Sequence, residues 1–263
     1  MSSGSSDSGT TDIGGQVRDQ LIRDLKEEKF LLYFQSIVPV APAAPDPALF
    51  REILIRFKDE ERDMMPPGSF LPILEQHGLM PLMDRWVTGQ AARSVRNVQA
   101  ASKGRASRCS INLSRDTVRR DGAFGDFAQQ TVARLGIEPS SLAFEIPMEE
   151  VISAPQAVAR LAGVLRPAGC GVSFSGFVGE LPALEFARSI DVNYVKVDGS
   201  LVYPISRDST AAAKLQLIQK SCRTFGVQTI CTQVEDAKTL EILRAIQVNY
   251  AQGFGIDRPR PLQ

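Results

Sequence analysis

The sequence predicts an irregular TIM (β/α)8 barrel, an α/β fold, in which the first strand runs antiparallel to the second. Eight short apolar runs alternate with helical segments along the 263 residues, which is the element count of such a barrel. Residues 39–47 join the first two runs; they are rich in Pro and Ala and too few for a full helix, so these strands should form an antiparallel pair. An open, doubly wound sheet is the alternative that the same alternation permits.

The first fifteen residues differ from the rest of the chain. Residues 1–15 are almost all Ser, Gly, Thr and Asp, so they bury little apolar area and are expected to be a flexible linker or a cloning remnant. They lack the apolar segment of a signal peptide. Within residues 16–28, Val17, Leu21 and Leu25 recur every four residues, which predicts an amphipathic helix. The barrel domain is therefore expected over residues 16–263.

The remaining elements follow from the spacing of apolar residues. Strands are expected at 31–38, 50–57, 107–113, 141–146, 171–174, 192–197, 227–231 and 249–252. Helices are expected at 68–76, 79–98, 122–135, 155–166, 209–225 and 236–245. In barrels of this kind the active face is built at the carboxyl ends of the strands, so polar residues at those ends are the candidate site.

Charge and hydropathy exclude several classes of protein. The chain has 30 Lys+Arg and 30 Asp+Glu, a balance that provides no field to hold duplex nucleic acid or an anionic membrane. The longest apolar candidate, 161–172, contains Arg166 and falls short of the ~18 residues of a membrane span. A cytoplasmic protein without membrane insertion is expected. The cysteines lack CxxC spacing, which favours buried reduced thiols over a zinc site: Cys109, Cys170, Cys222 and Cys231.

Polar residues gather at the predicted strand ends. Charged side chains that face a barrel interior are costly unless they are paired or liganded, so this set indicates a binding site. The candidates are Gln35, Glu52, Arg56, Asn112, Glu145, Ser175, Lys196, Asp198, Thr232, Glu235 and Gln252.

The order and spacing of several motifs resemble the EAL domain. These motifs are YFQSIV, EILIR, PPGSFLPILEQHGL, RWV, INLS, FEI, VKVDGS, QVE and QGFGI, and together they extend over nearly the whole chain. Active members of that family are cyclic di-GMP phosphodiesterases on an irregular TIM barrel. Here the signature triplet reads Glu52-Ile53-Leu54, with Ile53 in place of the usual Ala.

The metal ligands of that family are only partly present. The resemblance implies that Glu52, Asn112 and Glu145 stand at ligand positions, whereas Ser175-Gly176 replaces an Asp pair and Thr232 replaces a Glu. Two-metal hydrolysis needs anionic oxygen ligands that hold both ions and generate a bound hydroxide. The chain is therefore expected to be inactive and to require no Mg²⁺ or other cofactor, with Glu52, Asn112 and Glu145 as vestiges.

Positions that line the nucleotide cleft of the family are retained. The guanidinium of Arg56 suits a phosphodiester, Glu235 could accept hydrogen bonds from a guanine edge, and Phe254 could contact the base. By resemblance, the residues that bind cyclic di-GMP are Gln35, Leu54, Arg56, Lys196, Glu235, Gln252 and Phe254.

Some of these residues have structural alternatives. Arg56 could instead pair with Glu52 or Glu145 inside the barrel, and Glu235-Asp236 could simply cap the following helix. The single histidine, His77, is read as the end of a helix rather than as a ligand or base.

The resulting hypothesis is a catalytically inactive EAL domain that acts as a cyclic di-GMP receptor and signals to a protein partner or an adjoining domain, such as a degenerate GGDEF module. By analogy with similar receptors, a PilZ-type partner and control of type IV pili and twitching motility are expected. The alternatives are an interaction scaffold that no longer binds the nucleotide and a weak residual phosphodiesterase.

Overall fold

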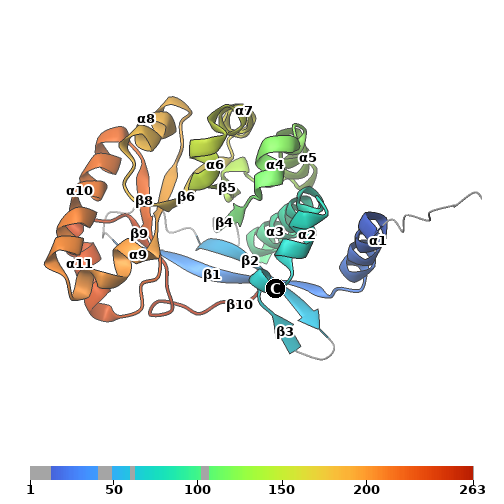
Figure 1. The fold of residues 1–263 in the computed structure, drawn as a ribbon, viewed down its shortest axis with the longest axis horizontal. Helices are drawn as coiled ribbons and strands as arrows, with labels where there is room; N and C mark the ends of the chain where they lie inside the picture. The colour runs from blue at the N-terminus through green and yellow to red at the C-terminus, as the bar shows by residue number, and fades with distance from the viewer. Residues whose placement is uncertain (1–12, 41–48, 60–62, 102–106, 263) are drawn as a thin grey trace, which may run out of the picture.

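The computed structural model describes residues 13–40, 49–59, 63–101 and 107–262. Within them a closed barrel of eight strands is surrounded by helices, as the sequence predicts (Figure 1). The strands are β1 (Phe30–Pro39), β2 (Leu49–Asp59), β3 (Asp63–Met65), β4 (Ser107–Asn112), β5 (Leu142–Pro147), β6 (Gly171–Phe177), β7 (Tyr194–Val197), β8 (Gln228–Cys231), β9 (Tyr250–Ala251) and β10 (Arg260–Pro261).

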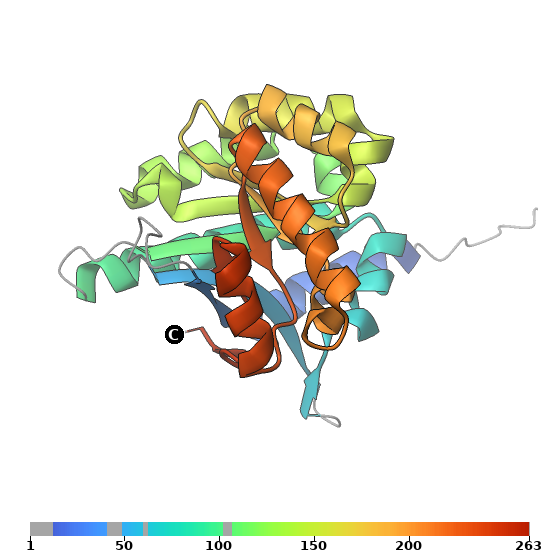
Figure 2. The same ribbon diagram turned by 90° about the vertical axis from the view of Figure 1, so that its left-hand side faces the viewer.

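The helices cover the outside of the barrel, and the two views agree on this arrangement (Figures 1 and 2). They are α1 (Ile13–Lys26), α2 (Leu71–Gln76), α3 (Met80–Ala101), α4 (Arg115–Arg120), α5 (Phe124–Leu135), α6 (Met148–Ser153), α7 (Pro155–Leu165), α8 (Leu181–Ser189), α9 (Gly199–Val202), α10 (Ser209–Phe225) and α11 (Ala237–Ile246). No helix in the described part of the chain is both long and apolar enough to span a bilayer.

Strand β1 makes the barrel irregular. It runs antiparallel to β2, with Phe30 opposite Phe57 and Ile37 opposite Phe50, which confirms the predicted antiparallel pair. It is also antiparallel to β9, and that pairing closes the ring. The other neighbours in the ring, from β2 through β4 to β9, pair in parallel.

Toward the amino ends of the parallel strands, the barrel interior is filled by apolar and aromatic side chains that contact one another. The ring centroids of Phe50 and Tyr194 are 5.3 Å apart, and both rings lie within 6 Å of Tyr250. Ile37 and Ile230 complete this apolar layer. Two residues further toward the carboxyl ends of β2, β7 and β9, the inward-facing side chains are polar. The polar site therefore lies directly above this apolar layer.

Several short elements were not predicted. Helices α4, α6, α8 and α9 and strands β3 and β10 are all short, so their apolar residues repeat too few times to show a period. Helix α1 begins at Ile13, three residues earlier than expected, so residues 13–15 are helical rather than linker. Residues 1–12 of the predicted linker lie outside the described residues.

The four cysteines are buried and form no disulfide, as predicted.

Candidate functional site

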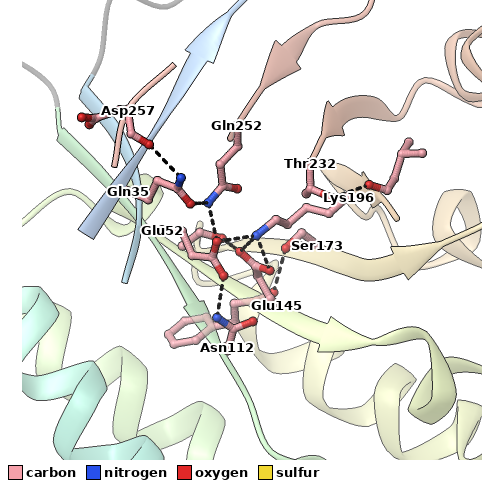
Figure 3. Close-up of polar contacts among 12 residues, drawn as sticks. Gln35, Glu52, Asn112, Glu145, Ser173, Lys196, Thr232, Gln252 and Asp257 are labelled. Carbon is pink, nitrogen blue, oxygen red and sulfur yellow. Dashed lines mark hydrogen bonds and ion pairs between the residues drawn. The ribbon is translucent and has the colours of Figure 1, made fainter. Parts of the chain in front are cut away.

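A cleft of about 550 Å³ opens at the carboxyl ends of the barrel strands. It brings together side chains from elements far apart in the sequence, and a close-up shows how they point toward one another (Figure 3). Its lining includes Gln35, Glu52, Asn112, Glu145, Ser175, Gly176, Lys196, Asp198, Thr232, Glu235, Gln252 and Phe254. Ten of the eleven polar candidates from the sequence therefore share one cavity with Phe254, and Arg56 is the exception.

Lys196 lies at the centre of this cleft, between two carboxylates (Figure 3). Its Nζ is 2.9 Å from Glu52 Oε2 and 3.0 Å from Glu145 Oε2. All three side chains come from barrel strands, and Lys196 is only 5% exposed. Its ammonium is therefore committed to two anions within the protein.

The pKa values of this group reflect burial and pairing. Burial disfavours the charged form of Lys196, but Glu145 and Glu52 outweigh it and raise its pKa to about 12. Burial likewise opposes ionisation of Glu52, yet Lys196, Asn112 and Gln252 hold its pKa below the ordinary value. For Glu145 burial dominates, and the nearby Glu52 adds to it, so its pKa is raised. The lysine therefore stays charged between the two carboxylates.

Hydrogen bonds orient the two carboxylates. Asn112 Nδ2 donates to Glu52 Oε1 at 2.8 Å, and Ser110 Oγ donates to Glu145 Oε1 at 2.6 Å. Ser110 was not predicted as a site residue, although it precedes Asn112 by two on β4 and so faces the same side of the strand. The remaining neighbour of Glu52 is Gln252, whose Nε2 donates to Glu52 Oε2 at 2.5 Å.

Gln252 leaves one polar atom without a partner. Its Nε2 also donates to Gln35 Oε1 at 3.0 Å, so the nitrogen is held by two acceptors. Its Oε1 is buried and accepts no hydrogen bond from the protein. A buried acceptor that stays unsatisfied costs free energy.

Three of the positions where the resemblance expects metal ligands carry no charged group: Ser175, Gly176 and Thr232. Gly176 has a left-handed backbone (φ 78°) at an irregularity in the β6–β7 pairing, beside Ser175. Thr232 Oγ1 donates to the carbonyl of Val197 at 2.9 Å, so its hydroxyl faces the backbone.

This donor set does not fit a pair of divalent cations. The carboxylates Glu52 and Glu145 both contact an ammonium, and no cluster of three or more His, Cys, Asp or Glu suited to a metal occurs among the described residues. Two ions at one site need several hard anionic ligands.

A second hollow of about 430 Å³ adjoins the cleft, and Asn112 lines both. Its walls are mostly apolar and include Leu54, Leu71 and Met80, with Arg115 at the rim. Leu54, predicted to line the cleft, therefore belongs to this neighbouring hollow. The two hollows therefore meet at Asn112.

Arg56 lines neither hollow. Its Nη1 donates to the carbonyl of Ile55 at 2.8 Å, and its guanidinium lies over the ring of Tyr33 at 5.7 Å. The structural alternative, in which Arg56 pairs with Glu52 or Glu145, is wrong because Lys196 takes both carboxylates. The side chain is half-buried in the carboxyl-terminal half of β2.

The loops after β8 and β9 carry the exposed part of the site. The cap of α11 is Asp236, whose side chain accepts from Thr239 N, so Glu235 is not used for capping and is exposed in the cleft. Phe254 is 58% exposed, with the guanidinium of Arg258 over its ring. His77 ends α2, as predicted.

Two glycines allow these loops to touch. A Cβ on Gly253 would lie 2.1 Å from the carbonyl oxygen of Val234, and one on Gly255 would lie 2.4 Å from the backbone of Glu235. The loop that carries Phe254 is thereby packed against the one that carries Glu235.

A model of the EAL domain matches residues 18–259. The chain belongs to the EAL domain family. It is 27% identical over 244 residues to the cyclic di-GMP phosphodiesterase PdeB of Shewanella oneidensis. The matched region covers 92% of this chain and 28% of PdeB. It is 26% identical to the bifunctional diguanylate cyclase/cyclic di-GMP phosphodiesterase MucR of Pseudomonas aeruginosa, over 93% of this chain and 36% of MucR. The chain thus spans about a third of the length of these curated relatives.

Solved structures agree with this EAL assignment. The MucR phosphodiesterase in complex with cyclic di-GMP has a TM-score of 0.83 at 25% identity, covering 94% of this chain and 98% of that one. The FimX EAL domain of Xanthomonas citri, also in complex with cyclic di-GMP, has a TM-score of 0.84 at 21% identity and covers 95% of both chains. The likeness to FimX shows the fold, which is the irregular barrel expected from the sequence.

Proposed function

We propose that this EAL domain is a cytoplasmic receptor that binds cyclic di-GMP without hydrolysing it. The observation that carries the proposal is the ion pair of Lys196 with Glu52 and Glu145. The ammonium occupies the two carboxylates that would otherwise be free to hold a metal, and it cannot activate a water molecule as a metal does. The neutral Ser175, Gly176 and Thr232 support the same conclusion.

Binding of the nucleotide is supported by the shape and polarity of the site. The cleft and its neighbouring hollow meet at Asn112, an arrangement that suits a ligand with two bases joined through a compact phosphodiester ring. The exposed carboxylate of Glu235 offers an acceptor, and Phe254 offers an exposed ring. Relatives named as cyclic di-GMP phosphodiesterases and structures solved with this nucleotide support the choice of ligand.

Phosphate recognition is assigned to Arg56. It is half-buried and lies on β2 two residues after Leu54, which lines the neighbouring hollow, so a movement off Tyr33 would bring its fork toward a phosphodiester bound there. Lys196 remains a ligand-binding candidate, but its ammonium is already paired with the carboxylates of Glu52 and Glu145. Its contribution to nucleotide affinity is expected to be smaller than that of Arg56.

The test is a calorimetric titration with cyclic di-GMP in Mg²⁺ and then in EDTA, with chromatography for the linear product. Binding should survive EDTA, and no product should form. Arg56→Ala should weaken binding about ten- to a hundredfold, because two charge-assisted bonds are lost. Arg134→Ala, an exposed arginine in the last turn of α5, should leave the affinity unchanged.

Three outcomes would contradict the proposal. Turnover of about 1 s⁻¹ or more, abolished by Glu52→Ala, would make the chain a phosphodiesterase. Binding heat that disappears in EDTA and returns with Mg²⁺ would place a metal in the site. No binding heat under either condition would leave an interaction scaffold.

The receptor is proposed to signal through a protein contact, with a PilZ-type protein and the control of twitching motility as the specific expectation. Exposed apolar side chains near the cleft support a protein contact, including Phe254, Val178 and Leu181. Size-exclusion chromatography with a purified PilZ-type protein, with and without cyclic di-GMP, tests it. Co-elution that depends on the nucleotide is expected, and separate elution in both conditions would contradict this partner.

A further inference from the structure

Gln233, two residues after the end of β8, has a left-handed backbone at the cleft. Its φ is 57°, a conformation that costs free energy for a residue with a Cβ but that glycine adopts readily. Gln233 lines the cleft and is exposed. Strain of this kind is retained at sites where a function requires the side chain. The glutamine therefore needs an explanation, because glycine would suit this backbone better.

The side chain of Gln233 lies against Gly199, the first residue of α9. A Cβ on Gly199 would lie 2.1 Å from Gln233 Cδ and 2.2 Å from Gln233 Oε1. Gly199 follows Asp198, which also lines the cleft. The amide of Gln233 is therefore held next to Asp198, in a space that is open only because residue 199 has no Cβ.

Other neutral donors of the cleft are already bonded to protein atoms. Gln252 Nε2 donates to Glu52 Oε2 at 2.5 Å. Thr232, the residue before Gln233, donates its hydroxyl to the carbonyl of Val197 (Figure 3). The side-chain amide of Gln233, in contrast, forms no hydrogen bond with any described residue. Its N–H groups are thus available to a ligand.

The cleft has little positive charge to offer an anion. Lys196 is the only cation among the described residues that line it, and its Nζ is paired with Glu52 and Glu145. Asp198 and Glu235 add two further carboxylates to the lining. A phosphate that enters this cleft therefore needs neutral N–H or O–H donors in place of the water it leaves behind.

We propose that Gln233 is a ligand-binding residue whose amide nitrogen donates a hydrogen bond to a phosphate of the bound nucleotide. The inference rests on the proposed function of the cleft as a cyclic di-GMP site. This nucleotide carries two phosphates, and the single fork of Arg56 serves one of them. The strained backbone is retained because glycine, the relaxed alternative, has no side chain that can donate.

Gln233→Gly separates stability from binding. It removes the strain, so the urea midpoint should rise, and it removes the amide, so the affinity for cyclic di-GMP should fall about tenfold. A residue with only a structural role does not move these two quantities in opposite directions. Gln247→Gly is the matched control: Gln247 has a φ of 63° at the end of α11 and is not among the described residues of the cleft lining. Its midpoint should also rise, but its affinity should stay unchanged.

Gly199→Ala tests the position of the side chain without altering Gln233. The nearest atoms to the added methyl group all belong to the flexible end of Gln233, so the chain should fold and the amide should be displaced. Affinity should fall about tenfold in the otherwise unaltered protein. In the Gln233→Gly background the same substitution should cause no further loss, because there is no amide left to displace.

Gln233→Glu identifies the group that the amide meets. It keeps the length of the side chain but replaces the donor with an anion. Next to a phosphate, this change should weaken binding more than Gln233→Gly does, and added salt should narrow the difference. Affinity equal to or above that of the unaltered protein would mean that residue 233 accepts from a hydroxyl or a base, and the phosphate assignment would be wrong.

The measurements are calorimetric titration with cyclic di-GMP in EDTA and urea unfolding of each chain. Unchanged affinity in Gln233→Gly, with binding by the unaltered protein, overturns this inference and leaves the proposed function standing. Absence of binding by the unaltered protein overturns both. A lower urea midpoint in Gln233→Gly, or an equal loss of affinity in Gln247→Gly, would assign the effect to packing or to loop relaxation and would contradict the role in binding.

Discussion

At the mouth of the barrel a lysine lies between two glutamates, whereas between α3 and α4 a buried aspartate meets only neutral donors. Asp84 Oδ2 accepts from Ser114 N at 2.8 Å, Ser114 Oγ at 2.7 Å and Thr117 Oγ1 at 2.6 Å, and it has no ion pair among the described residues. Asp84 lines the hollow that adjoins the cleft of Glu52 and Glu145, so the two sites lie at the same end of the barrel.

The two sites handle the cost of burying charge differently. Burial raises the pKa of Asp84 to about 6, although the bonds from Thr117 and Ser114 oppose it. At the barrel mouth Lys196 overcomes burial for Glu52, whose pKa is lowered. For Glu52 the lysine and two amide donors together outweigh burial, whereas hydrogen bonds alone do not for Asp84, and for Glu145 burial outweighs the same lysine. The comparison teaches that Lys196 sets the charge of the site, while Asp84 mainly orients the chain after Asn112.

The largest expected effect comes from removing the cation. Lys196→Met leaves Glu52 and Glu145 buried without an ion pair and should reduce the free energy of unfolding by about 3–5 kcal/mol. Without Lys196 the folded-state pKa of both carboxylates lies above the unfolded value. The variant is therefore least affected at low pH and loses stability as pH rises through those raised values.

Urea unfolding of Lys196→Met at pH 5 and pH 8 measures this difference. Lys214→Met, an exposed lysine on α10, is the matched control. A loss in Lys196→Met that is equal at both pH values would show that the lysine acts by packing rather than by charge.

The second prediction concerns Asp84. Since its folded-state pKa is raised from 3.8 to about 6, the protein should lose up to about 3 kcal/mol of stability as pH rises from about 4 to beyond 6. Asp84→Asn keeps an acceptor for Ser114 and Thr117 but cannot ionise, so it should flatten this dependence and be more stable than the parent at pH 7.

Unfolding free energies of Asp84→Asn across pH 4 to 8 test this, with Asp126→Asn on the exposed face of α5 as the control. A slope that persists in Asp84→Asn would assign it to another group.

The smallest expected effect is the loss of one hydroxyl hydrogen bond at each of the two sites, which can be compared directly. Ser110 and Thr117 each donate one hydroxyl bond of 2.6 Å to a buried carboxylate, to Glu145 and Asp84 respectively. Thr117→Val should cost about 2 kcal/mol at pH 7, because only Ser114 still donates to Asp84. Ser110→Ala should cost about 1 kcal/mol, since Lys196 still contacts Glu145. Chemical denaturation of both variants gives the order, and a larger loss for Ser110→Ala would reverse our account.

The barrel was predictable from the sequence because its strands are continuous apolar runs bounded by turns. β1, β2 and β5 each lie within two residues of their expected limits, and the antiparallel start followed from the linker between the first two strands. Strands β3 and β10 were not predicted, because two or three residues show no alternation and their pairing is decided by distant partners.

The membership of the site was predictable, but its internal pairing was not. Strand-end positions and the family resemblance placed Glu52, Glu145, Lys196 and Gln252 at one cleft. The sequence did not show that Lys196 rather than Arg56 would meet the carboxylates, because that depends on which side chain reaches the barrel axis. Asp257 was missed because its part in the site is played by a backbone carbonyl, which any residue can provide.

The pairing of β1 has a consequence for synthesis on the ribosome. β1 emerges shortly before β2 and can join it at once, but its other neighbours, β9 and β10, emerge more than 200 residues later. A nascent chain therefore carries an open edge along β1 until residues 250–261 leave the exit tunnel. Such long-range closure is slow, and Gln35 cannot meet Gln252 or Asp257 before it occurs. The hydrogen bonds of Gln35 to Gln252 and Asp257 thus form only in the last step of barrel closure.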